Sequence, residues 1–135
     1  MAKAKLSNSP PLTPEQQSQL VQRVEIYRQG VQKIHDAYWK EQGFTHNPGS
    51  VAIVEDATRF IRIKLAELAW LDRDDHTKGH IQTDREQIHT FIDKTTGDIL
   101  KPATYKAPAK HPRGNLFDDH NGLKYVNHYG PNYLR

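Results

Sequence analysis

An apolar stripe along residues 20–38 constrains the fold most, because it predicts a helix that needs a partner surface. Hydrophobic side chains recur there at alternating intervals of four and three residues, the spacing of one helical face. The positions are Leu20, Val24, Tyr27, Val31, Ile34 and Tyr38. An isolated helix of this length gains most of its stability from packing. The stripe is therefore expected to lie against a sheet or another subunit.

Start and stop signals bound this helix at about 13–42. Thr13 suits the N-cap, Pro14 suits the first helical position, and Gln16 completes a capping box. Gly43 predicts a left-handed cap at the other end. Residues 1–12, which end in a proline pair, are expected to form a flexible arm ahead of a single domain over 13–135.

The partner surface is predicted to be a small sheet over about 51–102. Residues 51–54 form a short strand candidate, and residues 59–66 alternate with period two, as a half-buried strand does. A helix over 56–71 stays open as the alternative, since apolar residues there also fall at helical spacing. We favour the strand.

A β-hairpin is the clearest local pattern in the chain. Strand-like residues 87–92 and 98–101 flank a short polar turn that contains Gly97, which can adopt a positive φ. Pro102 cannot donate to a ladder and is expected to end the second strand. Residues 72–84 before the hairpin are polar except for Ile81 and are expected to form a mobile loop.

Residues 103–135 are expected to be ordered but irregular. Prolines and glycines interrupt every run, yet the segment is too rich in aromatic residues for a disordered tail. The sequence therefore predicts an α+β fold: a long N-terminal helix packed on a small antiparallel sheet with a central β-hairpin, followed by an ordered irregular C-terminal segment.

Length and composition exclude several classes of protein. The chain has 135 residues, enough for one domain and a tail. It has no cysteine, which excludes a disulfide framework, a thiolate zinc site and a cysteine nucleophile. No apolar run approaches the roughly 18 residues of a membrane span, and the N-terminus lacks the apolar stretch of a secretory signal. No membrane partner is expected.

Positive charge is concentrated in the last third of the chain. Residues 101–135 carry six basic and two acidic side chains, a balance of +4 within a total net charge of +3. The first hundred residues therefore carry −1. A negatively charged partner is expected to meet the C-terminal third.

A basic loop within this third is the main candidate site. Its cations and histidine are Lys101, Lys106, Lys110, His111 and Arg113. These side chains can neutralise phosphates, and the interspersed prolines reduce the entropy lost when the loop is ordered around a ligand. Tyr105 can stack on a base, and Asn115 can donate to a phosphate oxygen. The alternative is a solvated loop whose lysines only maintain solubility.

A second candidate surface lies on the strand predicted at 59–66. Arg62 and Lys64 project there to the same side as Phe60, a mixture that nucleic-acid-binding sheets use. The alternative is an ordinary solvent face with the phenylalanine partly covered by the C-terminal segment.

The sequence predicts no catalytic, metal or cofactor site, so a binding protein is favoured over an enzyme. The carboxylates and histidines of residues 72–84 match no known ligand spacing. His-Asn-His nucleases use residue types that also occur here, but the intervals between them are too short; the residues are Asn115, Asp119, His120, Asn121 and His128. No nucleophile motif, Walker loop or Rossmann fingerprint occurs. His35 and His89 are expected to be packing or surface residues.

Residues 88–116 resemble a pattern in small uncharacterised proteins of tailed phages. In those proteins a strand ending F-[IV]-D-K leads through T-G-D into K-P-A-x-[YW]-K-A-P-A-K and then R-x-N. Here the matching stretches are Phe91–Lys94, Thr96–Asp98, Lys101–Lys110 and Arg113–Asn115. Residues 59–64 are similar to a [KR]-[YF]-I-R-I strand in the same proteins. The resemblance implies a phage origin and a location in the host cytoplasm or the virion, and it carries no activity.

Two functions follow as expectations. The first is a phage-encoded, non-enzymatic binder of phosphate-bearing ligands, either single-stranded nucleic acid or a small nucleotide. Sequestration of a nucleotide signal of host immunity is one possible use. The second is a virion structural or assembly protein in which the helix stripe and the aromatic C-terminal segment form subunit contacts. A homo-oligomer is expected under either function.

Overall fold

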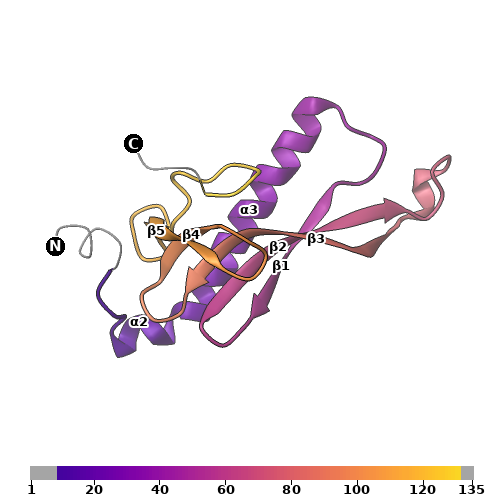
Figure 1. Ribbon diagram of the computed structural model, residues 1–135. Coiled ribbons are helices and arrows are strands. Elements are labelled where there is room, and N and C mark those ends of the chain that lie inside the picture. The colour runs from indigo at the N-terminus through magenta and orange to yellow at the C-terminus, as the bar shows by residue number, and fades with distance from the viewer. Residues whose placement is uncertain (1–8, 132–135) are drawn as a thin grey trace.

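The predicted α+β fold is confirmed by the computed structural model, which describes residues 9–131 (Figure 1). Two helices come first and five strands follow. The elements are α2 (Pro14–Ser18), α3 (Leu20–Gln42), β1 (Ser50–Asp56), β2 (Phe60–Trp70), the short 3-10 helix η1 (His76–Lys78), β3 (His80–Asp93), β4 (Asp98–Pro102) and β5 (Pro108–Asn115). Within the described residues, no helix combines the length and apolar character needed to cross a membrane.

The five strands form one antiparallel sheet in which neighbours in the chain are neighbours in space. Helix α3 lies across one face of this sheet (Figure 1). The strand reading of residues 59–66 is confirmed by β2, and the hairpin is confirmed by β3 and β4. Gly97 in the connecting turn has a φ of 77°, which a residue with a side chain rarely adopts.

The polar loop predicted for 72–84 is wrong in its extent. Strands β2 and β3 continue beyond the rest of the sheet as a two-stranded ribbon that carries η1 at its tip (Figure 1). Trp70 still pairs with His80, and its indole stacks on His76 with ring centroids 3.8 Å apart. In this ribbon the apolar end of β2 pairs with β3, as in Leu68 with Gln82 and Ala69 with Ile81, and the polar composition of 72–84 alone does not reveal that pairing.

The single helix predicted at 13–42 is divided at Gln19. The hydroxyl of Ser18 donates to the carbonyl oxygen of Glu15 (2.6 Å), the oxygen to which the amide of Gln19 would donate in a regular helix. That amide bonds instead to Gln16, so the chain breaks into α2 and α3. The predicted ends are confirmed: Thr13 and Gln16 form a reciprocal capping box, and the helix ends at a left-handed glycine.

The core lies between α3 and the helix-facing side of the sheet. On α3 the buried residues are Val24, Tyr27, Val31 and His35. The predicted stripe had Ile34 on the buried face, but in the structure its neighbour His35 is the buried residue. The sheet contributes Ile61, Ile63 and Leu65 from β2, with Ile92 and Ile99 from β3 and β4. Their period-two spacing on β2 places the odd-numbered residues toward the helix.

A fully buried chain of polar groups runs through this core. The Tyr27 hydroxyl lies 2.8 Å from the Thr90 hydroxyl, which lies 2.6 Å from Nδ1 of His89. Nε2 of His89 donates to the carbonyl oxygen of Asn127 (2.8 Å), so Nδ1 is the acceptor. Ile63 pairs with Thr90 while the next residue of β2 pairs with residue 88. His89 is therefore the extra residue of a β-bulge.

The C-terminal region is ordered, as predicted, over residues 103–131, and the rest of the predicted segment lies outside the described residues. It contains a strand that was not predicted. Prolines at 108 and 112 argued against a strand, yet both lie in β5. This strand is at the edge of the sheet and pairs with β4 alone. Edge positions tolerate proline because one side of the strand needs no ladder hydrogen bonds.

The remaining C-terminal residues return along α3. Asn121 bonds to Arg23 of α3, and Leu123 packs where a side chain on Gly30 would stand. Close approach to this leucine accounts for a glycine in the middle of the helix.

The arm expected at residues 1–12 lies mostly outside the described residues. Its end is held against the sheet: the Ser9 hydroxyl donates to Asp98 (2.6 Å), and Leu12 is buried with its amide bonded to residue 95.

The buried histidine predicts a pH dependence of stability. Burial lowers the pKa of His89 to about 4, whereas an unfolded histidine titrates near about 6.5. Between these values the unfolded state binds the extra proton, so the free energy of unfolding should fall as the pH falls, by up to about 1.4 kcal/mol per pH unit. Denaturant titrations of the parent and of His89→Gln, at pH values between 7 and 4, measure this slope.

The His89→Gln variant should lose most of the pH dependence of its unfolding free energy in this window. A smaller dependence should remain, because burial also lowers the pKa of His35. His111→Gln, which changes an exposed histidine, should keep the parental slope. An unchanged slope in His89→Gln would contradict the buried neutral histidine.

Candidate functional site

The basic segment predicted to bind phosphates forms β4, β5 and the turn between them. Lys106, Lys110 and His111 are exposed, and Lys101 is half-buried. Arg113 is 9% exposed and belongs to the buried part of β5. The cations available at the surface of this hairpin are therefore those of the turn and of the first half of β5.

A concavity of about 350 Å³ lies where β5 passes the start of β2. Lys110 lines it from β5, Phe60 from the start of β2, and Arg59 from the turn just before β2. The guanidinium carbon of Arg59 lies 5.0 Å from the centroid of the Phe60 ring. Two carboxylates, Asp93 and Asp98, also line it, and both accept hydrogen bonds from neighbouring protein groups. We call this site the basic concavity.

The predicted cations of β2 do not belong to the basic concavity. Arg62 pairs with Glu55 at 2.8 Å, and Nζ of Lys64 lies 3.0 Å from both Glu55 and Glu86. Lys64 is buried, and the Tyr105 ring covers its ammonium group at 5.5 Å. Burial acts to lower the pKa of Lys64, but hydrogen bonds to the two carboxylates and to Tyr105 outweigh burial and raise it. These positive charges are thus matched by carboxylates of the same sheet face.

Asn115 is engaged within the protein. Its Nδ2 donates to the carbonyl oxygen of Thr96 (2.9 Å) and to Asp98 (3.1 Å), and its Oδ1 accepts from the amide of Phe117 (2.9 Å). The side chain therefore joins the end of β5 to the turn before β4 and to the segment that follows.

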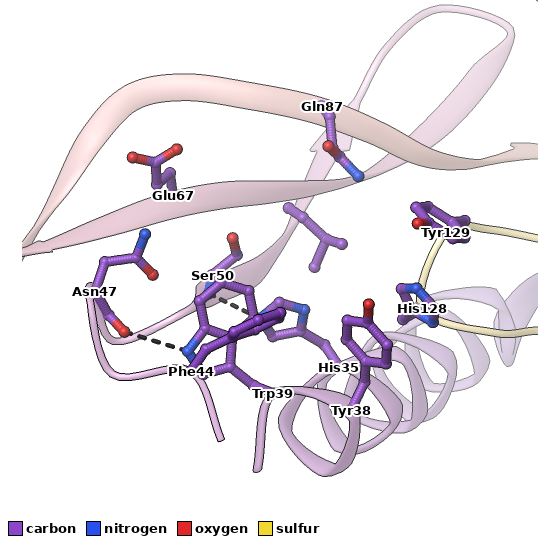
Figure 2. Close-up of a pocket in the computed structure, with 11 residues that line it drawn as sticks. His35, Tyr38, Trp39, Phe44, Asn47, Ser50, Glu67, Gln87, His128 and Tyr129 are labelled. Atoms are coloured by element: carbon purple, nitrogen blue, oxygen red, sulfur yellow. Dashed lines mark hydrogen bonds between the residues drawn. The ribbon is translucent and has the colours of Figure 1, made fainter. Parts of the chain in front are cut away.

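A second cavity, of about 330 Å³, lies between α3, the sheet and the C-terminal segment (Figure 2). Its aromatic walls are Tyr38, Trp39, Phe44 and Tyr129, with the imidazoles of His35 and His128, and we call it the aromatic pocket. The Tyr38 and His128 rings stack with centroids 3.5 Å apart and an 8° interplanar angle. Trp39 and Phe44 meet edge to face at 4.7 Å.

Hydrogen bonds hold two of these rings in place. Nε2 of His35 accepts from the amide of Ser50 (2.9 Å), and Nε1 of Trp39 donates to the carbonyl oxygen of Asn47 (3.2 Å), as Figure 2 shows. Burial lowers the pKa of His35, Asp36 acts to raise it, and the neighbouring His128 lowers it further. His35 is thus neutral at pH 7.

The sheet side of the aromatic pocket carries Glu67 and Gln87 (Figure 2). Glu67 is the one charged residue among the described residues that line the pocket. It stands at a register shift: Ala66 pairs with residue 86, whereas Leu68 pairs with residue 82. The extra residues, 83–85, belong to β3, and such irregularities are common beside functional sites. Within residues 9–131, no other residue bonds or pairs with the Glu67 carboxylate.

The part of the chain that the structure describes contains no group of three or more histidine, aspartate or glutamate side chains that could hold a metal ion. In the ribbon, Asp72 accepts from the amide of Asp74 and pairs with Lys78 at 3.3 Å, while His76 stacks on Trp70. These groups shape the tip of the ribbon.

Residues 74–131 match a family of unknown function (DUF7717). The match spans η1, β3, β4, β5 and the C-terminal segment, and it includes the residues 88–116 that carry the phage-protein resemblance. Helix α3, β1 and β2 lie outside it. No curated protein and no solved structure matches the chain.

The aromatic pocket was missed from the sequence. Its residues come from positions 35 to 129 and read individually as helix packing, loop or tail. One sequence feature could have indicated this pocket: three aromatic residues, at positions 38, 39 and 44, lie close together where the helix ends.

Proposed function

We propose that the protein is a non-enzymatic binder of phosphate-bearing ligands, either single-stranded nucleic acid or a small nucleotide. The observation that carries this proposal is the basic concavity, which Lys110, Arg59 and Phe60 line together. Cations of this kind neutralise phosphates, and an aromatic face offers a stacking surface for a base.

The exposed cations of the β4–β5 hairpin extend this surface. Lys106 lies in the turn, and His111 follows Lys110 on an edge strand that has no further neighbour in the described sheet. A backbone stiffened by prolines loses little entropy when a ligand orders it. We exclude Arg62 and Lys64 from the proposed binding residues, because carboxylates of the sheet already pair with them.

A phage origin is part of the proposal and rests on the resemblance of residues 88–116. A phage protein of this kind would act in the host cytoplasm. It would bind phage nucleic acid there or sequester a nucleotide signal of host immunity.

Removing two exposed lysines tests the proposal. Lys106→Ala with Lys110→Ala should weaken binding of a fluorescently labelled single-stranded oligodeoxynucleotide, measured by anisotropy over a salt series. The slope of log K against log salt should become shallower by about one to two, because each lost phosphate contact removes about 0.7 for a single strand. A fluorescent ATP analogue, measured in parallel, separates a polymer ligand from a small nucleotide.

Two matched variants serve as controls. Lys33→Ala with Lys40→Ala removes the same charge from exposed positions of α3, and Arg62→Gln removes a cation that Glu55 neutralises. Both should bind like the parent. Equal binding by the hairpin variant and the α3 variant, at every salt concentration, would disprove the basic concavity as the site.

A second candidate function, virion assembly through subunit contacts, is favoured by a different surface. An apolar groove of about 320 Å³ runs between the start of α3 and the edge strand β1. Val21 is 82% exposed and Val54 is 41% exposed beside it. An exposed apolar edge strand is a template for pairing with another chain. A second copy of this protein is the proposed occupant.

Multi-angle light scattering tests this candidate. The parent should form a dimer or larger oligomer, and Val21→Glu with Val54→Glu should shift it to monomer while the circular dichroism spectrum stays unchanged. A monomeric parent at high protein concentration would rule out self-assembly through this groove.

A further inference from the structure

The aromatic pocket combines ring walls with a single carboxylate, and we propose that it binds an organic cation. The ligand class is a guanidinium or alkylammonium group on an apolar stem. Its charge would pair with Glu67, and its stem would lie against the rings of Trp39, Phe44 and Tyr129. This proposal is independent of the phosphate-binding function, because it concerns the opposite face of β2.

The walls suit a cation because aromatic ring faces carry negative potential. Tryptophan, tyrosine and phenylalanine attract ammonium and guanidinium groups placed within about 6 Å of their centroids. Trp39 and Phe44 come from the end of α3 and the residues after it, whereas Tyr129 comes from the C-terminal segment. The rings therefore approach the cavity from more than one side (Figure 2).

The charges around the pocket favour the same ligand. The described lining has no lysine or arginine, and its one carboxylate, Glu67, has no protein partner within residues 9–131. Helix α3 ends at Gln42, just before Phe44, so the negative end of its dipole lies beside the cavity. His35 is neutral because it is buried, so it does not oppose a cation. An anionic ligand would find no charged partner here.

The pocket is also held in shape before any ligand arrives. His35 is fixed by the Ser50 amide, Trp39 by the Asn47 carbonyl, and His128 by its stack on Tyr38. Preformed walls reduce the entropy lost on binding. Glu67 is also held by the sheet, because it pairs with Ser50 of β1 and lies opposite the extra residues of β3 at the register shift.

Isothermal titration calorimetry with defined probes tests the proposal. The probes are agmatine, a small guanidinium, and N-acetyl-arginine methylamide, which represents an arginine side chain of a protein. The matching citrulline derivative, in which a neutral urea replaces the guanidinium, is the probe control. Both guanidinium probes should bind in the millimolar range or tighter, and the citrulline derivative should bind at least about tenfold more weakly.

Glu67→Gln keeps the size of the side chain and removes its charge. Its carboxylate supports no hydrogen bond of the fold, so circular dichroism and the melting temperature should stay close to the parent. Affinity for both guanidinium probes should fall about tenfold or more. Glu41→Gln, which changes an exposed carboxylate near the end of α3, should leave affinity within about twofold. Phe44→Leu, which keeps an apolar contact without a ring, should weaken binding as well.

The two guanidinium probes distinguish the source of the ligand. Tighter binding of agmatine indicates a free small cation, and tighter binding of the arginine derivative indicates a side chain of a partner protein. The proposal is overturned if neither guanidinium probe binds at millimolar concentration, if the citrulline derivative binds equally well, or if Glu67→Gln binds like Glu41→Gln.

Discussion

The buried polar chain from Tyr27 through Thr90 and His89 to Asn127 ties together three parts of the protein that are distant in sequence. It joins α3 to the middle of the sheet, and the sheet to the C-terminal segment. Each member is satisfied only while the others are in place, and a buried polar group without its partner is costly. His128 and Tyr129 directly follow Asn127 in the sequence. The buried hydrogen bonds that end at Asn127 therefore also position one wall of the aromatic pocket.

The alternation of β2 divides the chemistry of the molecule between two faces. Odd-numbered residues of β2 face α3 and end at Glu67 in the aromatic pocket, whereas Phe60, Arg62 and Lys64 face the other way. On that second face, pairs with Glu55 and Glu86 neutralise the central cations, and positive charge remains at the β5 side. The proposed anion site and the proposed cation site are thus separated by the thickness of the sheet.

Sequence patterns predicted those elements whose signals are local. The capping box at Thr13, the glycine stop at Gly43 and the hairpin around Gly97 each depend on a few adjacent residues, and all three are present. The break at Gln19 was missed because it arises from one hydroxyl competing for one carbonyl. Strand β5 was missed because its prolines are acceptable only at a sheet edge, and the strand order that makes it an edge is a tertiary property.

For the candidate sites, the sequence by itself determined which residue types were available and where charge was concentrated. It placed cations in the segment 101–113, of which Lys106 and Lys110 are exposed in the structure, whereas Arg113 is buried. Only the tertiary structure decided that Lys64 is buried between two carboxylates, that Arg59 and Lys110 line one concavity, and that rings from distant parts of the chain line one pocket with Glu67. The physical reason is that burial and charge pairing depend on which distant segments meet, and one-dimensional periodicity records only which face each residue occupies.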